Sequence, residues 1–493
     1  MANFGDVIIV IPGIFGSRLE RKDGTLFYDL TLARLPRTLW TLAGQGMSHL
    51  RPDAPPDDGV VATDLFNYQL LPGFFGNEDY GALLAALRNS VPYPDQQVIK
   101  FPYDWRASNR WAAEQLDRVA RDALKAWRAA SGNAQAKLWL VCHSMGGLVA
   151  RYFCEHLGGA EITRELITIC TPHRGAAKAL DVLVNGMRLG GLIDISRFVQ
   201  SLPSVYELLP QYPVLRDVSA SASGSGAAFR LADAYGLGDR LPLPRRAQAT
   251  GTPEPAPAFG GGLPKLDRSM LERAVDFHAA IRHPVVKRMD EGAPAPYTVR
   301  CFLNRRQPTF LSALLRGNDM QASSHDPLAL PDAQADPAQR GDGTVAAFAA
   351  VPIEWDDTSN AIAVSAKHVG MPASTVVTDA LHNWIHPLDA RAHMGGGVED
   401  RDVLGLLVPG AIRQGEDLAI EVDALTAANV TVTVEPPDGS KPAVSIRTRV
   451  PGNGQPVTLD LGKFAQGAWR VTITPEDRRR PAVSDYVLVL AGG

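Results

Sequence analysis

The chain has 493 residues, of which 45% are hydrophobic and 21% are charged. This composition is ordinary for a globular protein, and the length allows a large core domain with at least one smaller unit. The formal net charge of −4 gives no support to a nucleic-acid-binding protein or to binding of anionic membranes through bulk charge. No apolar run reaches the roughly 18 residues that predict a transmembrane helix.

The four cysteines, Cys142, Cys154, Cys170 and Cys301, show no Cys-x-x-Cys spacing and are few for this length. They therefore predict neither a zinc or iron–sulfur site nor a disulfide framework, and we expect buried, reduced thiols. The chain enters the apolar run at 7–11 without a basic region or a small-residue cleavage site. This start predicts a cytoplasmic protein without a signal peptide, and it leaves peripheral contact with a membrane open.

Short β-branched runs alternate with helical patterns in the first third of the chain, which predicts a mainly parallel sheet covered by helices. Strands are expected at 7–11, 97–101, 137–142, 165–170, 297–303 and 361–366. Ser108 can cap a helix that ends at Gly132, and a second helix is expected over 146–157. The pattern is that of an α/β protein.

Two segments interrupt this pattern, one over about 20–75 and one over about 180–290. In a hydrolase such insertions commonly form a cap or lid, but the sequence leaves equally open that they are core helices. Helical pieces are expected within the second segment at 182–192 and 198–209. Surface loops are expected at 219–226, 242–264 and 311–340.

The composition changes near residue 400, which divides a catalytic domain at 1–398 from a smaller domain at 399–493. Strand-like runs separated by turn signals lie at 418–422, 430–434, 443–447, 457–461, 469–473 and 486–490. They predict a small antiparallel, immunoglobulin-like β-sandwich. The sequence leaves open whether this domain binds a partner protein, docks on a membrane or braces the core.

The strongest local signal is the run Val-Cys-His-Ser-Met-Gly-Gly at 141–147, between an expected strand and an expected helix. This is the context of a nucleophile elbow, a tight turn that presents a serine hydroxyl at the sheet edge. The usual pattern is Gly-x-Ser-x-Gly, and Cys142 takes the first glycine position, where a small side chain still permits the turn. We predict that Ser144 is a catalytic nucleophile; the alternative is an incidental serine in a strand-to-helix turn.

A serine hydroxyl needs a base to take its proton and an acid to orient that base. In this fold the acid and then the histidine follow the serine along the chain. Asp342, flanked by Gly341 and Gly343, is predicted to be the acid, although Asp-Gly is also a common turn signal. His368 directly follows a strand-like run after Asp342 and is predicted to be the base.

The other histidines are expected to have structural or surface roles. His382 and His386 are four residues apart, a spacing that also suits a metal, but no third ligand stands out, so no metal site is predicted. His143 adjoins Ser144, and its side chain is expected to point away from the site.

Two backbone N–H groups are expected to stabilise the negative charge of a tetrahedral intermediate. One is the N–H of Met145, next to the nucleophile. The other is assigned to Ile14 in the segment Pro-Gly-Ile-Phe-Gly-Ser at 12–17, whose glycines let the backbone approach a substrate. The alternative for this segment is a generic glycine turn.

Four blocks of the sequence resemble, in order, the lecithin:cholesterol acyltransferase family, which includes lysosomal-type phospholipases. They are Ile-Pro-Gly-Ile-Phe-Gly-Ser-Arg-Leu at 11–19, Tyr-Asp-Trp-Arg at 103–106, His-Ser-Met-Gly-Gly at 143–147 and Leu-Pro-Ser-Val-Tyr-Glu-Leu-Leu-Pro at 202–210. The resemblance implies an α/β-hydrolase fold, an acyl-enzyme on Ser144 and a lipid or other acyl ester as donor. The chain departs from the secreted members because it has no cysteine pair for their lid loop, and the β-sandwich is not part of the core family pattern.

These features together predict a serine-dependent lipid acyl hydrolase or O-acyltransferase of the lipase or phospholipase type. It would need no metal or organic cofactor, and the acyl acceptor would be water or an alcohol. Two alternatives stay open: a non-lipid serine esterase of the same fold, and a non-enzymatic binding protein that works through its β-sandwich. No nucleic acid partner is expected, and the sequence does not identify a protein partner.

Overall fold

The computed structural model places most of the chain. The described residues are 4–24, 26–28, 50–51, 54–66, 80–189, 193–217, 228–242, 263–317, 319–323, 340–387, 403–436, 444–477 and 480–491. The loop expected at 219–226 lies outside these residues, as do most of the loop expected at 242–264 and the domain boundary expected between 398 and 399.

The centre of the catalytic domain is a six-stranded sheet in the order β15-β12-β7-β6-β1-β5. Every neighbouring pair of strands runs parallel, and this confirms the predicted α/β class. The strands are β1 (Val7–Ile11), β5 (Val98–Lys100), β6 (Leu138–His143), β7 (Thr163–Ile169), β12 (Thr298–Leu303) and β15 (Ile362–Ala363).

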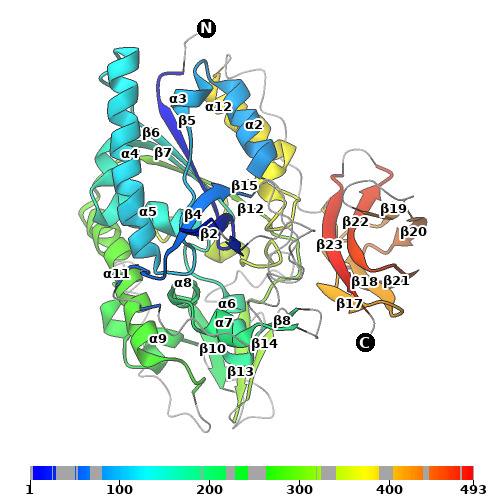
Figure 1. Ribbon diagram of the computed structural model, residues 1–493. Coiled ribbons are helices and arrows are strands. Elements are labelled where there is room, and N and C mark those ends of the chain that lie inside the picture. The colour runs from blue at the N-terminus through cyan, green and yellow to red at the C-terminus, as the bar shows by residue number, and fades with distance from the viewer. Residues whose placement is uncertain are drawn as a thin grey trace.

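Helices cover both faces of this sheet (Figure 1). The side chains of β1 alternate between the faces, because successive residues of a strand point in opposite directions. Val7, Ile9 and Ile11 pack into the core that includes α4 and α5, whereas Ile8 and Val10 pack into the core that includes α2 and α12. The covering helices are α2 (Tyr80–Ser90), α4 (Asn109–Ser131), α5 (Gly146–His156), α11 (Arg268–Glu291), which packs against α5, and α12 (Thr375–Ile385).

The helix α4 begins and ends at the predicted residues. The Ser108 hydroxyl accepts a hydrogen bond from the N–H of Arg110 at 3.3 Å, and Gly132 closes the helix with a φ of 70°. A serine cap and a left-handed glycine satisfy the free backbone groups at the two ends. None of the described helices combines the length and the apolarity that crossing a membrane requires.

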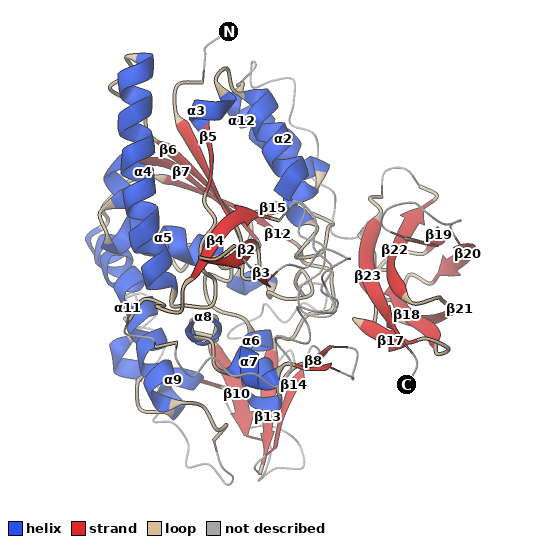
Figure 2. Cartoon of the chain, in the orientation of Figure 1, coloured by secondary structure: helices blue, strands red, loops and turns tan. Residues whose placement is uncertain are grey.

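Described residues of the two expected insertions take part in two small sheets. The first forms a three-stranded sheet of β2 (Ser17–Arg21), β3 (Leu26–Tyr28) and β4 (Val60–Leu65). The second contributes to a lobe below the main sheet, with a four-stranded sheet in the order β11-β10-β13-β14 (Figure 2). Its elements are α6 (Ala177–Asn185), α7 (Ser196–Gln200), α8 (Pro203–Tyr206), β10 (Pro213–Asp217), β11 (Phe229–Arg230), α9 (Leu231–Ala234), β13 (Ser312–Arg316) and β14 (Asp319–Ser323). Whether this lobe acts as a lid stays a prediction.

Three expectations for this lobe were wrong in part. The helix expected over 182–192 ends at Asn185, because Gly186 has a φ of 80°, and the hairpin of β8 (Arg188–Leu189) and β9 (Ile193–Asp194) follows it. The helix expected over 198–209 is two short helices, since Pro203 starts a new one. Residues 312–323 were expected in a loop and form the antiparallel hairpin of β13 and β14.

The C-terminal domain is a β-sandwich, as predicted. One sheet has the order β16-β18-β21 and the other β17-β23-β22-β19-β20. All pairs are antiparallel except β17 with β23, and the two sheets share one apolar core. The strands are β16 (Gly405–Leu407), β17 (Ala411–Arg413), β18 (Asp417–Asp423), β19 (Ala428–Glu435), β20 (Val444–Val450), β21 (Val457–Lys463), β22 (Gly467–Pro475) and β23 (Val483–Leu490).

Buried ion pairs join the sandwich to the catalytic domain. The carboxylate of Asp423 accepts hydrogen bonds from Arg306 at 3.1 Å and from Arg340 at 2.8 Å. Lys367 forms an ion pair with Asp485 of β23. Because Arg340 and Lys367 lie just before the predicted acid and base, these contacts favour a bracing role for the sandwich.

The substitution Asp423→Asn tests this junction. It removes the negative charge that faces the guanidinium of Arg306, whose side chain is 1% exposed, so the free energy of unfolding should fall by about 3 kcal/mol. Urea denaturation measures this loss. Asp417→Asn, at the exposed start of the same strand, should change stability by less than about 0.5 kcal/mol. Equal losses for the two variants would contradict the role of the buried pair.

Candidate active site

The three side chains predicted to act together are in contact at the carboxyl edge of the main sheet. Ser144 follows β6, Asp342 lies in a loop beyond β12, and His368 follows β15. His368 Nε2 lies 2.9 Å from Ser144 Oγ, and His368 Nδ1 lies 2.8 Å from Asp342 Oδ2. All three residues are at least nine-tenths buried. The geometry allows the imidazole to take a proton from the hydroxyl while the carboxylate orients the ring.

The turn that carries Ser144 is strained and tightly packed. Ser144 has a φ of 50°, in the left-handed region that non-glycine residues rarely adopt. A Cβ on Gly146 would lie 2.4 Å from the carbonyl oxygen of Pro12, and a Cβ on Gly147 would lie 2.0 Å from Thr171 Oγ1. The space around positions 146 and 147 therefore admits only glycine.

The carboxylate of Asp342 is fixed on both oxygens. Oδ1 accepts the N–H groups of Thr344 at 2.8 Å and Val345 at 2.7 Å, while Oδ2 faces His368. Burial by itself would raise the pKa of Asp342, but the charge of His368 and these hydrogen bonds outweigh it and hold the pKa below its usual value. The residue is thus ionised at neutral pH and suited to stabilise a charged imidazole.

The two backbone groups expected to bind an oxyanion have no partner within the described part of the chain. Neither the N–H of Ile14 nor that of Met145 donates to a described residue. Met145 stands at the N-terminus of α5, where the helix dipole favours negative charge. Phe15, directly after Ile14, has a φ of 65° that bends this segment. Their role as oxyanion donors stays a prediction.

A hydrogen-bond chain that the sequence did not reveal connects the Ile14 segment to His368. The N–H of Gly13 donates to the hydroxyl of Tyr80 at 2.9 Å, and that hydroxyl donates to Nδ1 of His143 at 2.8 Å. The Nε2–H of His143 then donates to the main-chain oxygen of His368 at 3.0 Å. This network assigns the neutral tautomer, and burial together with the neighbouring His368 lowers the pKa of His143 to about 3.

Nothing in the sequence around Tyr80 marks it as part of this hydrogen-bond network. Tyr80 lies 64 positions before Ser144, at the start of a helix that the sequence did not predict. His143 had a visible place beside Ser144, but only the fold shows that its ring reaches the backbone of His368. Both are positioning residues in the structure.

The possible metal-binding residues are mostly engaged with one another. Ligand atoms of Cys170, Asp342 and His368 lie within 4.8 Å of one another, but two of these residues are already paired. His382 Nδ1 contacts Ser90 Oγ at 2.9 Å, and no third ligand joins His382 and His386 among the residues that the structure describes. All four cysteines are buried and unpaired.

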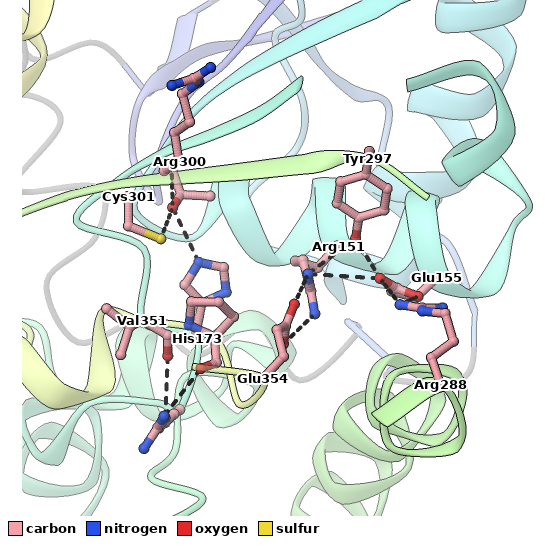
Figure 3. Close-up of polar contacts among 12 residues, drawn as sticks. Arg151, Glu155, His173, Arg288, Tyr297, Arg300, Cys301, Val351 and Glu354 are labelled. Carbon is pink, nitrogen blue, oxygen red and sulfur yellow. Dashed lines mark hydrogen bonds and ion pairs between the residues drawn. The ribbon is translucent and has the colours of Figure 1, made fainter. Parts of the chain in front are cut away.

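A buried ion network supports the helix that follows Ser144 (Figure 3). Arg151 of α5 donates to Glu354 at 2.8 Å and 3.1 Å and to the hydroxyl of Tyr297 at 3.1 Å. Glu155, one turn later, accepts from Arg288 of α11 at 2.7 Å and 2.9 Å. The network ties the helix of the predicted nucleophile to the segment that follows the predicted acid.

Glu207 anchors the segment 202–210 to the core. Its carboxylate accepts hydrogen bonds from the hydroxyl of Ser108 and from the N–H of Asn109 at 2.7 Å, so it caps α4. Its main-chain oxygen faces Nε2 of His278 at 2.7 Å. Burial raises the pKa of Glu207 to about 7, although these hydrogen bonds oppose the rise.

Glu207→Gln should change the pH dependence of stability. Between the unfolded pKa of 4.5 and the folded pKa of about 7, the folded state binds more protons than the unfolded state, so stability falls as pH rises. Above pH 7 the loss amounts to about 3 kcal/mol. Urea denaturation from pH 4.5 to 8 should show this fall in wild type and in the surface variant Glu291→Gln but not in Glu207→Gln. A parallel profile for Glu207→Gln would refute this account.

Tyr80→Phe should destabilise the fold. It removes the acceptor of the Gly13 N–H and the donor to His143, and leaving such buried groups unpaired costs about 1–3 kcal/mol. The free energy of unfolding in urea measures the effect. Tyr93→Phe, at a residue 55% exposed, provides the matched control, and an unchanged Tyr80→Phe would show that the hydroxyl has no such role.

Comparisons with known proteins agree with this architecture. A chain in the crystal structure of a Tle4–Tli4 complex is similar to it with a TM-score of 0.50 at 16% identity, over 78% of this chain and 98% of that chain. A CARDB domain from Pyrococcus furiosus, solved in complex with di-metal ions, covers 18% of this chain and 92% of its own at 13% identity, with a TM-score of 0.14 that supports no conclusion. No curated protein matches the chain significantly.

Residues 49–226 match the family model described as lecithin:cholesterol acyltransferase. This range contains the Tyr-Asp-Trp-Arg block, the Ser144 turn and the segment 202–210. The resemblance predicted from the motifs is confirmed for this segment, which matches the lecithin:cholesterol acyltransferase family model, and the chain has the predicted α/β fold.

Proposed function

We propose that this protein is a serine-dependent lipid acyl hydrolase or O-acyltransferase of the lipase or phospholipase type. The observation that carries the proposal is the contact of His368 with both Ser144 Oγ and Asp342 Oδ2, at 2.9 Å and 2.8 Å. The family match over residues 49–226 supports a lipid acyl ester as donor. A non-lipid ester of the same reaction class is the alternative that the experiment distinguishes.

In the first half of the reaction, His368 Nε2 takes the proton of Ser144 as its oxygen attacks the ester carbonyl. Asp342 stabilises the imidazolium that forms. The N–H groups of Ile14 and Met145 stabilise the developing oxyanion, since each is free to donate. His368 then protonates the leaving alcohol, and the acyl group stays on Ser144.

In the second half, water or an alcohol attacks the acyl-enzyme. His368 removes the proton of the acceptor and returns it to Ser144 Oγ when the acyl–serine bond breaks. The strained turn at Ser144 and its hydrogen bond from N–H to the carbonyl of Ile169 at 2.8 Å hold the oxygen in place through both halves. Every proton transfer of the reaction therefore passes through His368 Nε2.

Ser144→Ala tests the proposal. Wild-type protein should react with a fluorophosphonate probe and hydrolyse p-nitrophenyl esters, whereas Ser144→Ala should lose labelling and about 10⁴-fold or more of its turnover. Labelling is read by intact mass, and turnover by absorbance. Ser359→Ala, at an exposed loop residue, should behave as wild type. Failure of the folded wild-type protein to label would refute a serine nucleophile.

Substrate class is a separate measurement. Mass spectrometry of phospholipids and neutral lipids, before and after incubation with wild type and with Ser144→Ala, should show loss of intact lipid with wild type alone. Turnover of acetate esters without any lipid turnover would instead favour a non-lipid esterase.

A further inference from the structure

Arg282 is a buried cation that lacks a partner. It lies in the middle of α11 and is 5% exposed, and within the described ranges it neither donates a hydrogen bond nor forms an ion pair. Arg151 is comparably buried, but Glu354 neutralises it through two hydrogen bonds (Figure 3). A buried charge without a counter-charge is costly. The site of Arg282 is therefore incomplete without an anion.

The segment 207–213 contacts the backbone at two other arginines, Arg174 and Arg230, and also contacts α11. The N–H at position 211 donates to the carbonyl of Arg174 at 2.8 Å. The residue at position 213 pairs in register with Arg230 across β10 and β11. The carbonyl at position 207 contacts His278, which lies one turn before Arg282 on α11. One short segment thus touches the three elements that carry the arginines.

The charges of this cluster interact. Burial, with the positive charges of Arg174 and Arg230, lowers the pKa of Arg282 to about 9, so its guanidinium still carries a charge at neutral pH. Arg230 donates to Asp233 through Nε and Nη2, but its buried Nη1 has no hydrogen-bond partner in the described part of the chain. The positive charges of these guanidinium groups repel one another, and a bound anion would offset this repulsion.

We propose that Arg282 and Arg230 form a binding site for the phosphate group of a ligand. Arg174 adds positive charge to this site, while its Nε and Nη2 donate to the carbonyls of residues 351, 352 and 355. Guanidinium groups present planar pairs of donors that match phosphate oxygens, and such charge-assisted hydrogen bonds are strong. Free phosphate and the headgroup of a phospholipid share this chemistry. The phosphate site does not depend on the proposed acyl transfer, whereas its occupation by a headgroup would place it within that reaction.

The place of Arg174 brings the cluster near the candidate active site. Arg174 belongs to the loop after β7, at the same sheet edge as Ser144. Thr171 of this loop packs against Gly147, at the start of the helix that follows Ser144. A ligand held by its phosphate at this cluster would therefore lie on the substrate side of the sheet.

The test is thermal unfolding of the full chain in sodium phosphate and in sodium chloride of equal ionic strength. Phosphate should raise the Tm of wild type relative to chloride, because a ligand that binds the folded state stabilises it. Arg282→Gln should weaken phosphate binding about tenfold or more, since it removes a charged donor. Arg273→Gln, at an exposed arginine of the same helix, should keep the full rise.

The stability of each variant in chloride, without phosphate, is the control that shows whether the variant still folds. Arg282→Gln should be at least as stable as wild type in chloride, because it removes an uncompensated buried charge. Arg282→Lys keeps the charge but not the paired donors, and should show an intermediate rise. The proposal is overturned if phosphate gives wild type no specific rise, or if Arg282→Gln keeps the same rise.

Short-chain lipids distinguish the sources of the phosphate. In the Ser144→Ala background, dihexanoyl phosphatidylcholine should raise Tm, excess phosphate should compete with it, and dihexanoylglycerol should have no competing effect. A rise with phosphate but none with the phospholipid supports a site for free phosphate. Because Ser144→Ala keeps the phosphate rise while it loses probe labelling, failure of the site and failure of the proposed function give different results.

Discussion

The orientation of the His368 imidazole is the constraint on which the rest of the candidate site depends. Asp342 holds the ring through Nδ1 and accepts the main-chain N–H of the same histidine at 3.0 Å. His143 donates to its main-chain oxygen at 3.0 Å. Side chain and backbone are thus fixed together, and Nε2 has one direction left in which to act, toward Ser144. Fixed orientation of this kind lowers the entropic cost of bringing the imidazole and the hydroxyl into position for proton transfer.

Buried polar networks on both sides of the sheet supply the rigidity that this arrangement needs. The hydrogen bonds from Gly13 through Tyr80 and His143 join the segment after β1 to the loop after β15. The ion network at Arg151 holds the helix after Ser144 against the segment that follows the acid. Buried polar groups without hydrogen-bond partners destabilise the folded state, so each network contributes to stability only when its groups are paired. Arg282 stands apart as a buried charge that has no such partner among the residues placed in the structure.

Local signals explain why much of the site could be predicted. The strand at Val7–Ile11, the cap at Ser108 and the turn at Ser144 each depend on neighbouring residues in the sequence, and the chain order of the hydrolase fold then led to Asp342 and His368. Their contact in space is what the structure adds.

The parts that were missed depend on distant contacts. The helix α11 contains Pro284, which argues against a helix when the sequence is taken alone. Packing against α5 supports it, including the stacked rings of Phe277 and Tyr152 at 5.1 Å. The hairpin of β13 and β14 has mixed polarity, and β13 gains its second partner only when it pairs in parallel with the distant strand β10. Tyr80 has no local signature, since its role arises from two residues far away in the chain.

The junction with the β-sandwich limits how this protein could be recombined. Asp423 and Asp485 meet cationic side chains that immediately precede the acid and base loops, and Gln307 joins the carbonyl of Leu404 to the carbonyl of Gly341. A foreign sandwich grafted at this position would set three cations against whatever side chains it happened to carry. A chimera should therefore fold stably only when the new sandwich carries acidic residues at the positions of Asp423 and Asp485. The two domains are then expected to change together in evolution.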